Sequence, residues 1–186
     1  FVFLLAYLFY IDGVNTIVKM AVDYGLSLGF ESRHLITALL ITQFVGFPSA
    51  IGFGILGEKW NALGGIFIAL AVYMLITIWG YGLSDVKEFY ILAASVGLVQ
   101  GGLQALSRSY YAGLIPAGRE AEYFGFFNML GKFSAIVGPL LMGWVSLKTG
   151  NPRYSILVII VFFIAGAGLL LLHSKIKGKE QTPDHA

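Results

Sequence analysis

Six long apolar runs, separated by short polar links, occupy almost the whole chain. A helix needs roughly 20 consecutive apolar residues to cross a bilayer, and each run meets that requirement. Because the links are short, neighbouring runs are expected to be antiparallel. The sequence therefore predicts an all-α, polytopic membrane bundle over residues 1–174, followed by a basic and polar tail over residues 175–186. The six predicted spans cover about residues 1–24, 34–56, 62–83, 89–114, 121–147 and 154–172.

The composition supports a membrane protein and excludes several other classes. The chain is 58% hydrophobic and 12% charged, whereas soluble domains have about 25% charged residues. The lipid bilayer is therefore its first expected partner, and the scattered basic residues do not predict nucleic-acid binding. The absence of cysteine excludes disulfides and thiolate metal sites. The motifs HExxH, GxSxG and the P-loop are also absent, so no enzyme, cofactor or metal is expected.

The positions of lysine and arginine predict the orientation of the bundle, because these residues are enriched in cytoplasmic loops. An even number of spans places both ends of the chain on one side. A small excess of basic residues on that side predicts a cytoplasmic C-terminal tail, in a bacterial-type inner membrane. Phe1 already lies within an apolar run, with no features of a signal peptide. We therefore expect a fragment whose first six-helix half, or a second bundle, completes the protein.

The six runs are expected to form two inverted triplets. Pro48 and Pro139 occupy corresponding places in the second and fifth runs, which are also rich in small residues. The first and fourth runs carry charged or amide side chains, and the third and sixth carry no charge. Duplication of a unit with an odd number of spans inverts its topology, as in many secondary transporters.

Polar side chains on three of the runs are the candidates for function. Their spacing places those of each run on one helical face, and charged groups at membrane depth usually face a bundle interior or a wet cavity. We predict that the three faces meet at one solute- or ion-binding site. The predicted site residues are Asp12, Asn15 and Lys19 in the first run, Gln100, Gln104 and Arg108 in the fourth, and Asn128 and Lys132 in the fifth.

Two charges near the middle of the bilayer allow more than one interpretation. Asp12 is predicted to bind a proton or another cation, and Lys132 an anionic group of the solute. Alternatively, Asp12 could pair with Lys132 or Lys19 merely to neutralise both charges. Lys19 could instead extend to the lipid headgroups, and Arg108 could do the same or contribute to a gate.

Two further segments are predicted to act in gating. Gly138 and Pro139 should bend the fifth span, because proline cannot donate a backbone hydrogen bond. This bend is either static packing or a hinge for alternating access. The turn after the second span contains Gly57, Glu58 and Lys59 and could be an interfacial turn or a gate.

That turn resembles the cytoplasmic G-x-L-x-[DE]-[RK] motif of the major facilitator superfamily, although Trp60-Asn61-Ala62 departs from the fuller motif. The segments LFYIDGVNTI, QALSRSYYAGLIPAGREAEYFGF and NMLGKFSAIVGPLLMG resemble the vacuole-effluxer-like branch of that superfamily. The resemblance implies twelve spans in two bundles around a central cavity, with these six as the seventh to the twelfth. It also implies that the first and fourth spans line the cavity and that the third and sixth face lipid.

Two classes of function follow from these observations. The first is half of a secondary active transporter that moves a small polar solute by alternating access. The resemblance adds amino acids as candidate substrates, because fungal relatives are linked to amino-acid efflux from the vacuole. The alternative is a non-transporting membrane scaffold or assembly subunit, in which the buried charges only set the register of the helices.

Overall fold

The structure is a computed structural model that describes residues 1–59 and 61–180, without the side chains of residues 54, 56–59, 179 and 180. Its described part consists of helices joined by short links, and six spans are long and apolar enough to cross a membrane. The helices are α1 (Val2–Ser27), α2 (Ser32–Lys59), α3 (Ala62–Tyr81), α4 (Val86–Ala112), α5 (Glu120–Phe133), α6 (Val137–Thr149) and α7 (Pro152–Glu180). The predicted all-α bundle of six spans is therefore confirmed.

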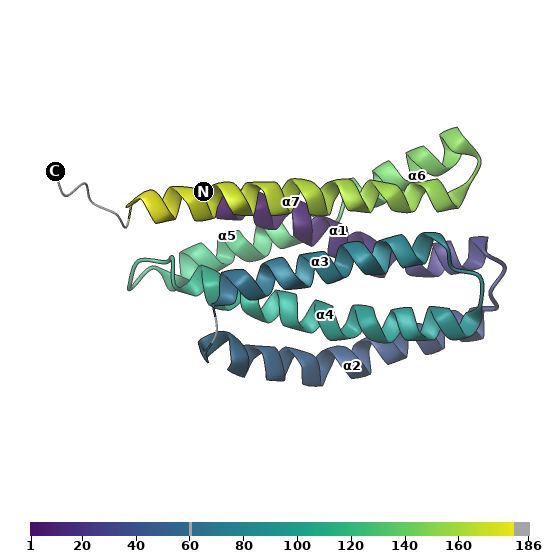
Figure 1. Cartoon of the computed structure of the whole chain (residues 1–186), viewed down its shortest axis with the longest axis horizontal. Coiled ribbons are helices and arrows are strands. Elements are labelled where there is room, and N and C mark those ends of the chain that lie inside the picture. The colour runs from purple at the N-terminus through teal and green to yellow at the C-terminus, as the bar shows by residue number, and fades with distance from the viewer. Residues whose placement is uncertain (60, 181–186) are drawn as a thin grey trace.

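Consecutive spans run in opposite directions, whereas the packed helices α2 and α4 run in the same direction, as do α1 and the pair α5 and α6 (Figure 1). α2 ends, α3 begins and α4 is linked to α5 at the end of the bundle where α7 finishes, whereas the α1–α2, α3–α4 and α6–α7 links lie at the opposite end (Figure 1). Polar side chains cap the starts of two of these helices. The side chain of Asn61 accepts hydrogen bonds from Leu63 and Gly64 at the start of α3, and Asp85 caps α4 in the same way. Such caps satisfy backbone N–H groups that a helix leaves free.

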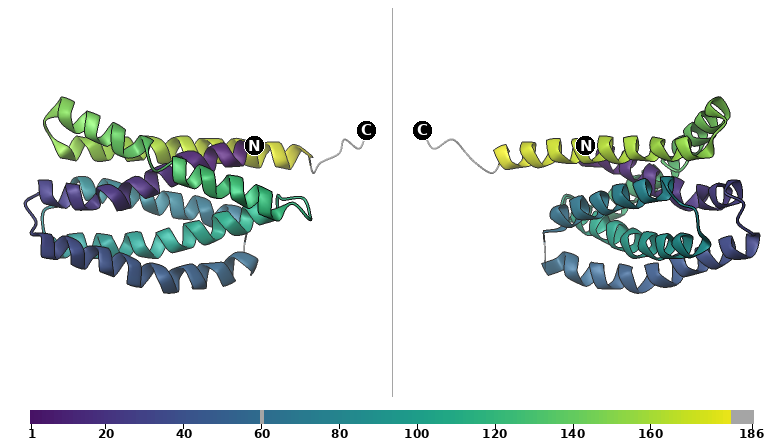
Figure 2. Two further views of the ribbon diagram at one scale, coloured as in Figure 1. Left: turned by 180° about the vertical axis from the view of Figure 1, so that it is seen from behind. Right: turned by 45° about the vertical axis from the view of Figure 1, so that its right-hand side comes forward.

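The packing of the helices repeats between the two triplets. α1 packs on α7 and on the pair α5 and α6, whereas α4 packs on α3 and on α2. Helices α3 and α7 also pack on each other between the two sets. This exchange of partners is the arrangement expected of two inverted three-helix repeats. Figure 2 shows the same helices from behind and from an oblique angle.

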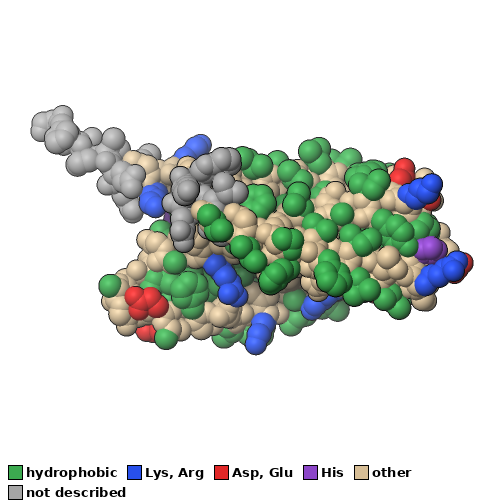
Figure 3. All heavy atoms as spheres, turned by 90° about the horizontal axis from the view of Figure 1, so that it is seen from below, with side chains coloured by type: hydrophobic (Ala, Val, Ile, Leu, Met, Phe, Trp, Pro, Cys, Tyr) green, Lys and Arg blue, Asp and Glu red, His purple; other side chains and the backbone are tan. Residues whose placement is uncertain are grey.

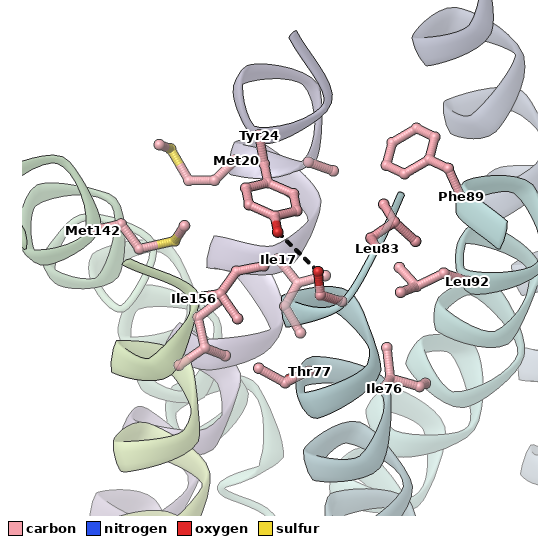
Figure 4. Close-up of a pocket in the computed structure, with 13 residues that line it drawn as sticks. Ile17, Met20, Tyr24, Ile76, Thr77, Leu83, Phe89, Leu92, Met142 and Ile156 are labelled. Atoms are coloured by element: carbon pink, nitrogen blue, oxygen red, sulfur yellow. Dashed lines mark hydrogen bonds between the residues drawn. The ribbon is translucent and has the colours of Figure 1, made fainter. Parts of the chain in front are cut away.

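The interior of the bundle is aromatic and aliphatic. Tyr73 of α3 stacks on Phe163 of α7 with ring centroids 5.2 Å apart, and both side chains are fully buried. Figure 4 shows a small apolar pocket between α1, α3, α4, α6 and α7, where the Tyr24 hydroxyl donates to the Gly80 carbonyl at 2.8 Å. Its lining is almost wholly apolar, so the pocket offers few partners for polar groups.

Two features of the helices differ in detail from the predicted boundaries. The fifth span is divided into α5 and α6 by Ser134–Ile136, called here the α5–α6 break. α7 continues to Glu180, so the helix includes the first residues of the segment predicted as a tail. By contrast, α2 continues through Pro48 without interruption.

Candidate functional site

Polar side chains from α1, α4 and α5 surround an open hollow of about 450 Å³. Most predicted site residues meet here, although they are far apart in the sequence. The polar hollow, as we call it, is lined by Tyr7, Ile11, Asn15, Gln104, Arg108, Asn128, Gly131 and Lys132.

Helical spacing explains how the sequence places these groups on one surface. Gln104 and Arg108 are one turn apart on α4, and Asn128 and Lys132 are one turn apart on α5, so each pair shares a helical face. The Arg108 guanidinium donates from Nη2 to the Asn128 Oδ1 at 3.3 Å and connects the two helices. These four side chains are exposed in the structure. They can therefore contact a solute in the hollow.

Gln100, Asp12 and Lys19 do not line the polar hollow. The Gln100 Oε1 is buried and has no hydrogen-bond partner among the described residues. Asp12 is 3% exposed, and its carboxylate points to the start of α6 rather than into the hollow. These three residues therefore belong to the surroundings of the hollow.

The carboxylate of Asp12 binds the start of α6, directly after the α5–α6 break. Its Oδ1 accepts a hydrogen bond from the backbone N–H of Gly138 at 3.1 Å and another from the Thr16 hydroxyl at 3.4 Å. Gly138 lies in the first turn of α6, where backbone N–H groups are free and the helix dipole favours an anion. Asp12 therefore supplies the acceptor and the negative charge that this helix start requires.

Asn15 and Lys19 bind the carbonyl side of the same break. Pro139 cannot donate to the carbonyl of Ala135, four residues earlier, and the Lys19 Nζ donates to that oxygen at 3.1 Å. Asn15 Nδ2 donates to the Gly131 carbonyl and to the Ser134 hydroxyl, each at 3.3 Å. One face of α1 thus satisfies backbone groups that the break in the fifth span leaves free.

These contacts bear on the predicted pairing of Asp12 with a lysine. In the described part of the chain, the ion pairs are Arg33–Glu31 and Arg119–Glu122, both on exposed side chains. Asp12 forms no ion pair with Lys132 or Lys19 there. The start of α6 and the Thr16 hydroxyl, rather than a neighbouring cation, are its direct partners.

Several residues of the site are absent from the predicted set. Tyr7 lines the hollow and stacks on Phe127 with ring centroids 4.0 Å apart. Tyr10 and Ser107 hydrogen-bond at 2.8 Å and connect α1 to α4. Tyr7 lies two turns before Asn15 on the same helical face, so extending the polar stripe of α1 toward the N-terminus would have included it.

The predicted gating residues fall into two groups. Gly138 and Pro139 lie in the first turn of α6, directly after the α5–α6 break. Gly138 is buried against α1, where an added Cβ would meet the Thr16 hydroxyl and the Asp12 carboxylate. Gly57, Glu58 and Lys59 lie outside the residues whose side chains the structure describes, so their role in gating stays a prediction.

Six spans in two inverted triplets, with a polar hollow on one side, define the class: a helical membrane protein built like half of a major facilitator fold. The model of the family described as "Vacuole effluxer Atg22 like" matches residues 1–183. The chain therefore belongs to the Atg22-like vacuole effluxer family of the major facilitator superfamily.

Curated relatives agree with this membership. The chain is 41% identical over 170 residues to the "Uncharacterized MFS-type transporter YxiO" of Bacillus subtilis, covering 91% of this chain and 40% of the relative. It is 39% identical over 105 residues to Autophagy-related protein 22 of Eremothecium gossypii, covering 56% of this chain and 21% of the relative. Autophagy-related protein 22 of Yarrowia lipolytica is 28% identical over 194 residues, covering 97% of this chain and 32% of the relative.

The chain thus spans two fifths or less of the length of these relatives. No solved structure matches the chain.

Proposed function

We propose that the chain contributes six spanning helices to a secondary active transporter that moves a small polar solute by alternating access. The polar hollow is the observation that carries this proposal. Its exposed cations and amides lie on helices that are otherwise apolar, and polar groups at membrane depth usually mark a solute or ion pathway. Membership of a family of effluxers and the likeness to an MFS-type transporter support the same function.

In this proposal, a second bundle closes the open side of the hollow and completes the cavity. Amino acids are candidate solutes, and the membrane is a bacterial-type inner membrane with the tail on the cytoplasmic side. The protein acts as a carrier rather than as an enzyme. Alternating access requires the cavity walls to tilt, and the α5–α6 break supplies a place where the fifth span can bend.

Asp12 is proposed to couple a proton or another cation to this motion. A cation bound at the carboxylate competes with the Gly138 N–H, which donates to Asp12 Oδ1. Binding would weaken the contact between α1 and the start of α6 and allow α6 to move. The buried position of Asp12 beside the break supports this role over direct binding of the solute.

Replacing the cations of the hollow should abolish transport without unfolding the protein. We expect Arg108→Gln and Lys132→Gln, in the full-length protein, to reduce solute uptake into proteoliposomes by about tenfold or more, because each removes a charge-assisted hydrogen bond. Lys148→Gln is the matched control, since Lys148 is exposed in the last turn of α6, away from the hollow. Unchanged uptake of an identified solute in both hollow variants would remove the site assignment.

Asp12 variants should separate its coupling role from its structural role. Asp12→Asn keeps an oxygen that accepts from Gly138 but cannot be protonated or carry charge. We expect the variant to fold and to lose the dependence of uptake on a proton or cation gradient. Asp12→Ala also removes the acceptor, leaves the Gly138 N–H unpaired and should lower the free energy of unfolding by about 1–3 kcal/mol. Gradient-dependent uptake in Asp12→Asn would exclude Asp12 as the coupling group.

A membrane scaffold or assembly subunit is the second candidate function. The observation that favours it is that Asp12, Asn15 and Lys19 hydrogen-bond to backbone groups around the α5–α6 break. In a scaffold, these three side chains have a purely structural role. A scaffold predicts intact partner binding and no solute flux in the full-length protein, even when a broad panel of solutes is tested. The exposed cations of the hollow have no task in that function.

A further inference from the structure

An apolar groove of about 230 Å³ lies between α2, α3 and α4, separate from the polar hollow. α2 and α3 each pack on α4 but scarcely contact each other, which leaves a space between them. The α2–α3 groove, as we call it, has Phe53 of α2 and Ile68 of α3 at its sides and Val99, Leu103 and Leu106 of α4 at its floor. The three floor residues are buried, whereas Ile68 is exposed, so the groove is closed toward α4 and open at the surface.

Small residues determine the shape of this groove. A Cβ on Gly102 of α4 would lie 2.7 Å from the Phe53 ring, so the ring lies directly on the backbone of α4. A Cβ on Gly65 of α3 would likewise lie 2.8 Å from the Leu106 side chain. One turn further along α3, the small side chain of Ala69 also lines the groove. The contacts at the two glycines hold α2 and α3 against α4, and the small residues leave a volume that the described side chains do not fill.

The chemistry and the length of the groove match one leaflet of a bilayer. Among its described lining residues, Asn61 alone has a polar side chain, and it lies at the start of α3, at the end of the bundle where α7 finishes. From Asn61 to Val72, α3 rises about 16 Å, and half of the hydrocarbon core of a bilayer is about 15 Å thick. A bound water needs about two to four polar partners, which the lining does not supply. The groove therefore suits a linear apolar occupant.

The groove and the polar hollow lie on opposite sides of α4. Gly102 and Leu106 line the groove, and each is two residues from Gln104 of the hollow, which places it about 160° away around the helix. Figure 3 shows the basic side chains between the two ends of the molecule toward one edge, whereas hydrophobic side chains cover much of the rest of that face. In the proposed function, a second bundle closes the hollow, so it cannot also cover the opposite side of α4. The lipid of the bilayer is the remaining cover for the groove.

We propose that the α2–α3 groove binds one acyl chain of a phospholipid, from the leaflet at the end of the bundle where α7 finishes. This inference goes beyond the proposed function and needs from it only that a second bundle closes the hollow. The bound chain fills the space between α2 and α3 and supplies dispersion contacts that an empty groove would lack. Asn61 then lies at the level of the headgroup, where its amide N–H groups can donate to ester or phosphate oxygens while its Oδ1 caps α3.

A photoreactive phospholipid tests the inference on the full-length protein. The probe is a phosphatidylglycerol with a diazirine in its acyl chain, titrated into protein that has been stripped of lipid in detergent, and the labelled peptides are identified by mass spectrometry. We expect labelling of residues 65–72 to saturate, whereas labelling of residues 157–164, an apolar segment of α7 with exposed side chains, should rise in proportion to the probe. Ala69→Phe should lower the saturable labelling about fivefold or more, because the ring occupies the groove and weakens binding.

Ala71→Phe is the matched control, because Ala71 is exposed on the same helix and does not line the groove. Its labelling should equal that of the parent protein. Monodispersity in detergent shows whether Ala69→Phe is folded, and saturation in the parent protein tests the inference even if that variant is not. Proportional labelling of residues 65–72 without saturation would show contact with bulk lipid only, and would overturn the inference.

The second bundle is the competing occupant, and a photoreactive side chain distinguishes it from lipid. p-Benzoylphenylalanine placed at Ile68, at the side of the groove, should cross-link to phospholipid in nanodiscs. A cross-link to the other half of the protein would show that protein covers the groove, and would overturn the inference. These readouts do not require a transported solute, so absence of uptake would contradict the proposed function and leave the lipid site in place.

Discussion

Gly138→Ala is expected to destabilise the protein strongly, because the first turn of α6 lies directly against α1. A Cβ at this position would overlap the Thr16 hydroxyl and would lie 2.9 Å from the Asp12 Oδ1. Moving α6 away to relieve the overlap also lengthens the hydrogen bond from the Gly138 N–H to Asp12, now 3.1 Å. Overpacking and a weakened buried hydrogen bond together should lower the free energy of unfolding by about 2–4 kcal/mol.

The measurement is unfolding of the full-length protein in mixed micelles, followed by tryptophan fluorescence, with monodispersity in detergent as a second readout. Gly143→Ala is the matched control on the same helix, because nothing lies within 4 Å of a Cβ added there. This control should be neutral or slightly stabilising, since alanine favours helix formation over glycine. Equal stability of the two variants would contradict the close contact between α1 and α6.

Gly101→Ala should have a similarly large effect at the contact between α2 and α4. A Cβ on Gly101 would meet the carbonyl oxygen of Gly46 and would lie 2.8 Å from the backbone nitrogen of Ala50. Because both are backbone atoms, no side-chain rotation relieves the overlap, and the helices must separate. Separation would also lengthen the hydrogen bond from the Thr42 hydroxyl to the Ala93 carbonyl, now 3.0 Å. We expect a loss of about 2–4 kcal/mol.

Gly52→Ala is the control for this contact, because it lies on α2 in open space and changes the same residue type. In the same measurement, we expect the free energy of unfolding of this control to be close to that of the parent protein. A double variant of Gly101→Ala and Gly138→Ala should lose the sum of the two effects, because they act on different helix pairs. If only one of the two single variants lost stability, the helices at the other contact would tolerate separation.

The spans could be predicted from the sequence because apolar length is a local property, and so could the polar faces of α1, α4 and α5. The partners of those faces could not be predicted in the same way. The charge pattern allowed Asp12 to pair with Lys132 or Lys19, yet its hydrogen-bond partners are the backbone N–H of Gly138 and the Thr16 hydroxyl. That N–H group is available to Asp12 only because the helix is interrupted just before it, at the α5–α6 break.

The break itself was only partly foreseeable. Pro48 and Pro139 each remove a backbone hydrogen-bond donor, but α2 remains continuous and the fifth span does not. The difference lies in the tertiary contacts: α1 offers Asp12, Asn15 and Lys19 to the backbone groups around Ser134–Ile136. A single run of sequence does not contain that information, since the compensating residues are more than a hundred positions away.

The length of α7 has a mechanical consequence. Its 29 residues extend over about 44 Å, whereas the hydrocarbon core of a bilayer is about 30 Å thick. Its last turns therefore form a rigid stalk, and this stalk is attached to α4: the Tyr110 hydroxyl lies 2.9 Å from His173 Nε2, and Lys177 lies over the Tyr110 ring at 5.3 Å. Tyr110 follows Arg108 by two residues, so we expect a tilt of the helix that bears Arg108 to move the last turns of α7 as well.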